Sequence, residues 1–549
     1  MTDARRTALR LIDGPQGRLD GPTNDAALAE RIEALVQQPG AVQQLTPLEL
    51  HRLTRRAGPL ESLPLLELAR GEQVRDVMDL QVWRDPANLD CTLLLEWMSA
   101  LTQLSDGAFR RHYRALDVEV IALLLLRTTK IFLLQEDEQP DEPEGRFFST
   151  PDGWFVLDLV GDNETQNDQL AAFIGALYRE APDDARRLLH NVIAELPTEL
   201  EETAARWRRG RLEDLGFSDA NEALRIYAYL DPTQVSPESD GTADQPLRAD
   251  PEPTGQGEVA TVVPPDPTCF WNRGLAEVED DDERRRLGAA LVSLCNLNLA
   301  ADRVDPSDLE RVNRTLEHLR GRLSLGLELL SRGTPAAAPA ALRQVALMRI
   351  ARLGHSLVLQ QQRRVLPLLR TGQLAHGSDR LGLLDTTWHE PIAALLATPP
   401  LHAPPRGPRR PFAARAELET LAASIDELVV ALQLVPPDLR PAPLPATATL
   451  GTLFCTAAVN EALGRQGALD RAALHTLRDR LAATEGPDAA LGAAAERVAA
   501  ARLGAAPSAT ALALVNGWLV ALHRELSALT DVVIDPRFVK RVWVATELR

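Results

Sequence analysis

Lysine is almost absent from this chain of 549 residues. Of its 59 basic residues only Lys130 and Lys540 are lysines, and the rest are arginine. A phosphate-binding P-loop needs a Gly-Lys-Ser/Thr step, because the lysine ammonium reaches the outer phosphates, and neither lysine follows a glycine. The composition therefore excludes a P-loop of that form. The joint excess of arginine and alanine is typical of a GC-rich bacterial genome, so we expect a bacterial source.

Cysteine is also scarce. The four cysteines, Cys91, Cys269, Cys295 and Cys455, lie far apart and form no CxxC pair. This spacing argues against a disulfide framework or a cysteine-based zinc site, so we expect reduced thiols packed in cores. The ten histidines form no HxxxH or HExxH pair, which argues against a zinc hydrolase of that type. We expect no metal and no cofactor.

Long apolar runs are missing as well. The most apolar segment, Val118–Leu134, is interrupted by Arg127 and Lys130 and is shorter than the ~20 apolar residues of a spanning helix. It predicts a core helix. Met1–Asp20 mixes charged and apolar residues and has no continuous apolar stretch, so we expect no secretory signal. We therefore predict a cytoplasmic protein that does not insert into membranes.

The charge balance is strongly acidic. The net charge of −19 repels nucleic acid and anionic lipid at long range, so we expect no nucleic-acid partner. The length predicts two to four domains. A Pro/Gly-rich acidic stretch with little periodicity is the clearest boundary. We predict an N-terminal extension (1–44), a helical array (45–230), an acidic linker (231–267) and a second helical domain (268–549).

Helix signals dominate the chain. Thr46 and Glu49 have the spacing of a capping box, with a proline at the first helical position between them. The same spacing recurs at Thr198–Glu201 and Asp219–Glu222. Asp305-Pro306 predicts the start of a long helix, whose apolar residues follow a period near 3.6 and form one buried stripe: Leu309, Val312, Leu316, Leu319, Leu323, Leu327 and Leu330.

One β-hairpin is predicted near 147–157. Phe147 and Phe148 precede Thr150-Pro-Asp-Gly153, and Trp154–Leu157 follows. Proline presets φ and glycine accepts a positive φ, so Pro-Asp-Gly between aromatic and β-branched runs predicts a turn. At the other end of the chain, Asp535–Val544 is expected to form a short strand or a docked edge.

A weak internal repeat lies in the N-terminal part. Thr46–Leu66 and Ser105–Leu126 each contain a cap, an amphipathic helix, a short break and a second apolar helix. Stacked helical hairpins bury faces that one unit cannot bury alone. We predict a mostly α fold of stacked helical hairpins (a superhelical array) with one small β-hairpin, plus a second helical domain. In pattern, this part resembles the helical N-terminal domain of MgtE-type magnesium transporters.

Several longer segments carry a family resemblance. Glu195–Leu230 reads ELPTELEETAARWRRGRLEDLGFSDANEALRIYAYL, and later segments read CFWNRGLAEVED, RLSLGLELL, RLGHSLVLQ, LLDTTWHEPIAALL, LFCTAAVN and DPRFVKRVW. Together they resemble an uncharacterised bacterial family of large helical cytosolic proteins, a domain of unknown function. The resemblance runs from about Leu45 to the C-terminus. It implies a coherent fold and transfers no activity.

The densest basic patch is Arg206-Trp207-Arg208-Arg209-Gly210-Arg211. Arginine forks bind carboxylate or phosphate in a bidentate way, and tryptophan stacks on cations or bases, so Arg206, Trp207, Arg208, Arg209 and Arg211 are candidate binding residues for an anion or an acidic peptide. The alternative is a helix C-terminus, capped by Gly210 and favoured by the helix dipole. The arginines would then pair with nearby carboxylates: Glu199, Glu201, Glu202, Glu213 and Asp214.

A second candidate site surrounds Trp388 and His389 in the predicted second domain. His389 is a potential general base that Asp385 or Glu390 would orient. The alternative is that Asp385 or the threonine after it caps a helix beginning near Pro391, which leaves His389 partly exposed.

His355 is the third residue of this possible pocket. It follows Gly354 in an apolar helix, and the alternative is a satisfied core histidine. We predict a protein-interaction scaffold or regulatory factor with a protein partner, because helical arrays offer extended concave surfaces and no convergent catalytic set is apparent. The alternative function is an enzyme or small-molecule sensor, whose pocket lies between helices near His355, Trp388 and His389.

Overall fold

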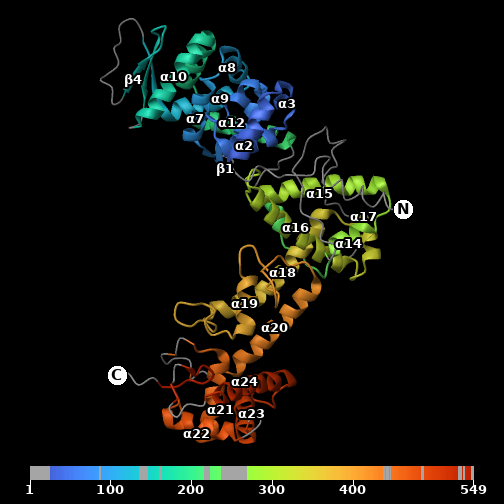
Figure 1. Cartoon of the computed structure of the whole chain (residues 1–549). Helices are drawn as coiled ribbons and strands as arrows, with labels where there is room; N and C mark the ends of the chain where they lie inside the picture. The colour runs from blue at the N-terminus through green and yellow to red at the C-terminus, as the bar shows by residue number, and fades with distance from the viewer. Residues whose placement is uncertain are drawn as a thin grey trace.

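A computed structural model describes residues 25–85, 88–134, 146–159, 163–215, 223–235, 269–436, 439, 444, 447–483, 488–529, 534–535 and 538–545. These residues are mostly helical, as predicted, and form three lobes that follow one another from one end of the molecule to the other (Figure 1). We call them the N-terminal lobe (described residues of 25–215), the middle lobe (223–370) and the C-terminal lobe (371–545). Among these residues no helix is long and apolar enough to cross a membrane.

The N-terminal lobe is a stack of short helices around one apolar core. Leu28 and Val42 belong to this core, so two helices of the segment predicted as an extension pack with the array. The helices are α2 (Asp25–Val36), α3 (Pro39–Gln44), α4 (Pro47–Ala57), α5 (Leu63–Leu68), α6 (Gly71–Gln81), α7 (Cys91–Leu101), α8 (Asp106–Tyr113), α9 (Val118–Thr128), α10 (Glu164–Glu180), α11 (Pro182–Ala194) and α12 (Pro197–Asp214).

Local capping explains where several of these helices begin. Thr46 and Glu49 form the predicted capping box of α4, and Ser105 caps α8. The prediction at Thr198–Glu201 is wrong, because α12 begins with a proline at its first position and has no side-chain cap. The predicted pair Asp219–Glu222 lies outside the described residues.

Two small antiparallel sheets belong to this lobe: β1 (Trp83–Asp85) with β2 (Asn88–Leu89), and β3 (Thr129–Leu133) with β4 (Arg146–Ser149) and β5 (Phe155–Leu159), in the order β3-β5-β4. The predicted hairpin is confirmed as β4–β5. The prediction of one core helix over Val118–Leu134 is wrong. Helix α9 ends at Thr128, and the chain continues as β3 because Thr129–Leu133 pairs with the fully buried strand β5.

The middle lobe has its own core between long helices. It contains the 3-10 helix η1 (Leu224–Tyr227), α14 (Phe270–Ala276), α15 (Asp281–Ala301), α16 (Leu309–Leu330), η2 (Pro335–Ala337), α17 (Ala338–Gln344) and α18 (Leu347–Arg370). The predicted apolar stripe of α16 is largely buried. The helix begins at Leu309 rather than at Asp305-Pro306, because Asp308 caps it.

Glycines allow α16 and α18 to cross closely. A Cβ on Gly354 would lie 1.9 Å from the carbonyl oxygen of Arg322, and one on Gly326 would lie 2.0 Å from that of Ile350. Only hydrogen fits at both points, so the two backbones are in direct contact. The crossing fixes the orientation of the side chains beside it.

The C-terminal lobe has the largest core, which includes the second half of α18. It contains α19 (Thr386–Leu395), α20 (Arg415–Leu434), α21 (Leu450–Leu463), α22 (Arg471–Ala482), α23 (Ala489–Leu503) and α24 (Ala509–Ser527). The predicted docked edge at the C-terminus is present, since Val544 forms a bridge with Leu469, and Val539 and Val542 are buried. Of the predicted linker (231–267), only residues 231–235 are described.

A cluster of side chains joins the N-terminal and middle lobes. His51 of α4 is fully buried, and its Nε2 lies 3.1 Å from Oδ1 of Asp305, in the loop before α16. Arg55 Nε lies 3.4 Å from the other oxygen of Asp305, and Arg52 donates to the Pro306 carbonyl. Three side chains of α4 therefore hold the loop before α16 against the N-terminal lobe.

Candidate interaction surface on the N-terminal lobe

Helix α12 carries the arginine patch and lies against α9 and α6. Leu200 and Ala204 are the buried residues that hold it to the core. Positions separated by seven residues lie on nearly the same side of an α-helix, so Arg211 continues the side that Ala204 occupies. The patch is thus placed partly against the lobe and partly toward solvent.

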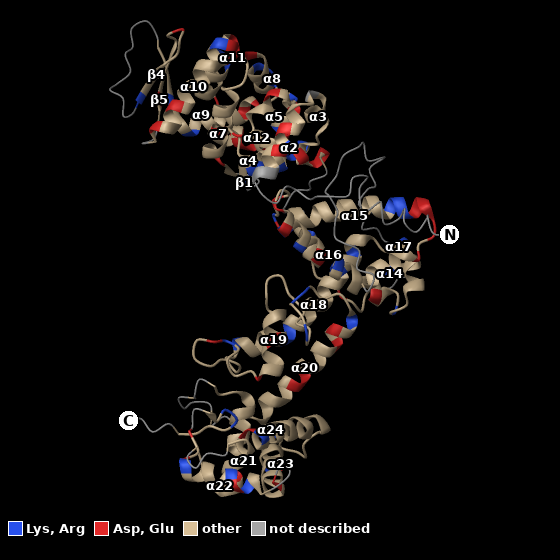
Figure 2. Cartoon of the chain, in the orientation of Figure 1, with Lys and Arg blue, Asp and Glu red and all other residues tan. Residues whose placement is uncertain are grey.

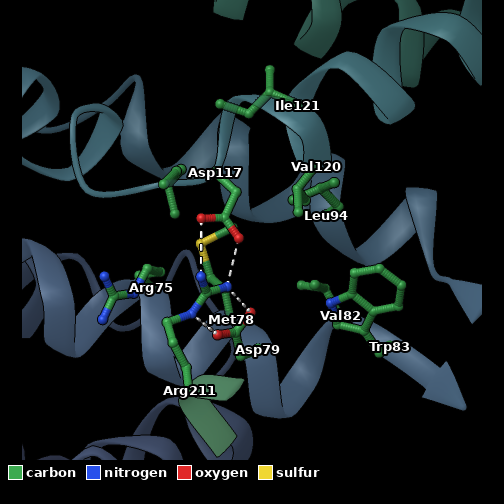
Figure 3. Close-up of a pocket in the computed structure, with 11 residues that line it drawn as sticks. Arg75, Met78, Asp79, Val82, Trp83, Leu94, Asp117, Val120, Ile121 and Arg211 are labelled. Atoms are coloured by element: carbon green, nitrogen blue, oxygen red, sulfur yellow. Dashed lines mark hydrogen bonds and ion pairs between the residues drawn. The ribbon is translucent and has the colours of Figure 1, made fainter. Parts of the chain in front are cut away.

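Arg211 binds two carboxylates, one on α6 and one just before α9 (Figure 3). Its Nε and Nη2 donate to the two oxygens of Asp79 on α6, at 2.7 and 3.1 Å. Its Nη1 and Nη2 donate to Asp117, which precedes α9, at 3.0 and 2.6 Å. The guanidinium therefore ties α12 to α6 and α9 by two bidentate contacts.

Burial and ion pairing act against each other in this cluster. It raises the pKa of Asp79, and the hydrogen bonds from Arg211 reduce this rise without cancelling it, while Asp117 adds to it. Burial alone would lower the pKa of Arg211, but its bonds to Asp79 and Asp117 outweigh burial and raise it. Arg211 therefore remains charged and compensates the carboxylates.

A cavity adjoins the ion cluster, but it is small. Its volume is about 20 Å³, and a water molecule needs at least about 10–15 Å³ of such space. It admits a water but no substrate. Its lining is mostly apolar: Arg75, Met78, Asp79, Val82, Trp83, Leu94, Leu116, Asp117, Val120, Ile121 and Arg211.

Arg208 is the second inward contact of the patch. Its Nε donates to the backbone oxygen of Asp79 at 2.8 Å, and its guanidinium lies 5.3 Å from the ring centre of Trp83. Arg206, Trp207 and Arg209 are exposed, and the side chain of Trp207 is large and apolar with 55% of its surface accessible. Helix α12 thus exposes a tryptophan between arginines. The contacts of Arg208 and Arg211 fix the helix to the rest of the lobe.

The alternative interpretation of the patch as a capped helix end is wrong in its details. Helix α12 continues through Gly210 to Asp214, so Gly210 is no cap. The partners of Arg211 come from α6 and the start of α9, not from the carboxylates of α12. Of those carboxylates, Glu201 instead accepts from Arg127 at 2.5 Å.

His355, one of the three residues of the other candidate site, lies in the middle lobe on α18. Its ring packs edge-on against Tyr227, with 5.3 Å between ring centres. Burial and the nearby charge of Arg322 lower the pKa of His355 to about 4. The imidazole is therefore neutral at pH 7.

Trp388 and His389 lie on α19 in the C-terminal lobe. Trp388 is buried and packs edge-on against Trp518. The helix begins at Thr386, with Pro391 inside it, so the expected start near Pro391 is wrong.

The carboxylates that were expected to orient His389 have other partners. Asp385 accepts from the Thr449 hydroxyl and the Gly451 amide at 2.8 and 3.1 Å. Glu390 accepts from Arg409 at 2.6 and 2.9 Å. His389 itself is partly exposed.

The remaining polar groups form no further site of a familiar kind among the described residues. Within the part of the chain that the structure describes, no three His, Cys, Asp or Glu side chains are placed to hold a metal ion, and the four cysteines are free. Sequence reasoning missed Asp79 and Asp117 as partners of the patch. The available signal was Asp79 itself, a carboxylate among the buried positions Val77, Met78 and Val82, where an unpaired charge is costly.

The fold and this site define a mostly helical protein of three lobes with an arginine-anchored helix on its first lobe. The chain belongs to a family of unknown function (DUF6178), whose model matches residues 25–545 and thus nearly the whole chain. No curated protein and no solved structure matches the chain.

Proposed function

We propose that this protein is a protein-interaction scaffold or regulatory factor and that α12 is its contact helix. The observation that carries the proposal is the exposed Trp207, placed between Arg206 and the anchored Arg208. Tryptophan and arginine dominate the energetic centres of protein interfaces. Because hydrogen bonds of Arg208 and Arg211 already fix α12 to the lobe, the helix loses little conformational freedom on binding.

The expected partner is a protein with an acidic surface that also accepts an aromatic side chain. Guanidinium groups at positions 206 and 209 favour carboxylates. Nucleic acid is not expected, since the chain carries a net charge of −19. In the view of Figure 2, basic residues are interspersed with acidic ones along the helices. The proposal places the protein in the cytoplasm, in keeping with its free cysteines.

The test compares two tryptophan variants in affinity purification from the native host. Trp154, at 54% accessible, matches the exposure of Trp207 but lies in the turn of the hairpin. We expect one stoichiometric partner that Trp207→Ala loses and Trp154→Ala retains. The proposal fails if the tagged chain recovers no partner, or if both variants retain it equally.

A second function, an enzyme or small-molecule sensor, is favoured by one observation in the middle lobe. Beside His355 lies a buried arginine, Arg322, with no carboxylate partner among the described residues. Screening small molecules by thermal shift tests this function. A ligand whose shift disappears in His355→Gln or His389→Ala supports it, and the absence of any shift contradicts it.

A further inference from the structure

Arg322 is the buried cation of the middle lobe. Only 8% of its surface is accessible. Its Nη2 donates to Oδ1 of Asn298 on α15 at 2.6 Å, and its Nε makes a long contact of 3.4 Å with the His318 carbonyl. Its Nη1 is buried and has no hydrogen-bond partner within the described ranges. A guanidinium has five N–H donors, and this one uses few of them.

Among the residues that the structure describes, the charge of Arg322 also has no counter-ion. None of the ion pairs between described residues includes it. Asp302 of the neighbouring helix end accepts a hydrogen bond from the Tyr227 hydroxyl. A buried charge without an ion pair costs several kcal/mol. The described surroundings of Arg322 therefore lack a negative group that would neutralise its charge.

The charge of Arg322 acts on two histidines. His318 is one turn before Arg322 on α16, and His355 comes from α18. Burial, together with the charge of Arg322, lowers the pKa of both to about 4, and Arg314 contributes at His318. Each ring is an additional donor, or on protonation an additional cation, for any anion that enters.

A strap of the chain (residues 223–235, including η1) covers the cluster. The Tyr227 ring lies 4.9 Å from the guanidinium carbon of Arg322 and also packs on His355. The strap is held to α18 by a few polar contacts: Arg352 donates to the Ala228 carbonyl at 3.1 Å, and the Leu230 amide donates to Ser356 at 2.8 Å. Ala223 and Ile226 of the strap are also buried in the core of the lobe, so opening of the site requires these two side chains to leave that core.

We propose that Arg322, His318 and His355 form a binding site for a small oxyanion, a phosphate or a carboxylate, which Tyr227 covers when the site is empty. An oxyanion accepts the unused N–H groups of the guanidinium in the bidentate geometry that arginine favours. It also supplies the missing negative charge. Tyr227 substitutes for it through its π face, which is a weaker partner for a cation than a carboxylate or phosphate.

The experiment is isothermal titration of the full chain with inorganic phosphate, and separately with acetate as the carboxylate probe. We expect one site per chain. Arg322→Gln should weaken it by about tenfold or more, because charge-assisted hydrogen bonds to an anion are lost. The matched control is Arg311→Gln, an exposed arginine of the same helix, which should bind as the wild type does.

A second variant keeps Arg322 and changes only the cover. Tyr227→Ala removes the competing ring, so a larger fraction of molecules is open and the apparent affinity should rise. Binding to phosphate alone, or to acetate alone, identifies the oxyanion class of the site. Absence of binding to both probes in the wild type and in Tyr227→Ala overturns the proposal, as does equal binding by Arg322→Gln. These outcomes do not depend on Trp207, so the interaction role is tested separately.

Discussion

Gly354→Ala tests the claim that α16 and α18 touch through their backbones. The added Cβ would lie 1.9 Å from the Arg322 oxygen, and real Cβ atoms essentially never approach other atoms within 3.0 Å. The obstructing atoms are backbone, including the carbonyl carbon at 2.7 Å and the Cα at 2.9 Å, so no side chain can rotate away. The two helices must separate by about 1 Å.

Such a separation is costly at a packed crossing. Overpacking a core costs about 1–3 kcal/mol, and a gap of 0.5–1 Å removes a quarter to a half of each contact energy it affects. Alanine returns about 1 kcal/mol through its higher helix propensity. We therefore expect a net loss near the upper end, about 2 kcal/mol, in the free energy of local unfolding of the middle lobe.

Hydrogen exchange measured on peptides of α16 and α18 is the suitable assay, because a chain with three cores does not unfold in two states. A loss of 2 kcal/mol corresponds to roughly thirtyfold faster exchange where the opening equilibrium determines the exchange rate. The control is Gly288→Ala on α15, whose Cβ would meet no atom within 4 Å. It should exchange at the same rate or more slowly. Equal exchange in the two variants would refute the close crossing.

Three further outcomes are expected. Arg211→Leu should destabilise the N-terminal lobe by about 3–5 kcal/mol, because it leaves buried carboxylates unpaired. The exposed Arg206→Leu should change its stability by less than about 0.5 kcal/mol, and hydrogen exchange on peptides of α6, α9 and α12 compares the two variants. Asp305→Ala should free the N-terminal lobe from the middle lobe, which small-angle scattering would detect as a broader distance distribution. Burial and nearby arginine charge lower the pKa of His318 and of His355 from 6.5 to about 4 in the folded chain. The unfolded chain therefore binds protons first, and the stability of the middle lobe falls as pH drops from 6.5 to 4, by on the order of 1–3 kcal/mol for each histidine. Hydrogen exchange on peptides of α16 and α18, corrected for the intrinsic rate at each pH, should show this fall, and His→Gln variants should reduce it.

Local patterns in the sequence predicted much of the fold. The capping box at Thr46 and Glu49, the stripe of α16 and the Pro-Asp-Gly hairpin all depend on residues within a few positions of one another. Such signals follow from helix and turn geometry alone. The error at Val118–Leu134 had a different origin, because strand β3 exists only through its pairing with β5, which lies outside that segment.

The sequence predicted the basic cluster of the candidate site but not its partners. The basic cluster on α12 was apparent, but Arg211 and Asp79 are 132 residues apart, and no local rule joins them. The sequence therefore could not distinguish the inward arginines, Arg208 and Arg211, from the outward ones. The apolar stripe of α16 likewise concealed Arg322, whose partner Asn298 comes from another helix.

A buried charged side chain can be compared in each lobe by the partners that surround it. In the N-terminal lobe, Arg211 faces two carboxylates. In the C-terminal lobe, the carboxylate of Asp385 accepts from a threonine hydroxyl and a backbone amide, and Arg541 lies 3.8 Å away. Both centres are compensated, as buried charges require. Arg322 is 8% accessible and has no charged partner among the described residues, so the middle lobe is where a missing anion best explains the structure.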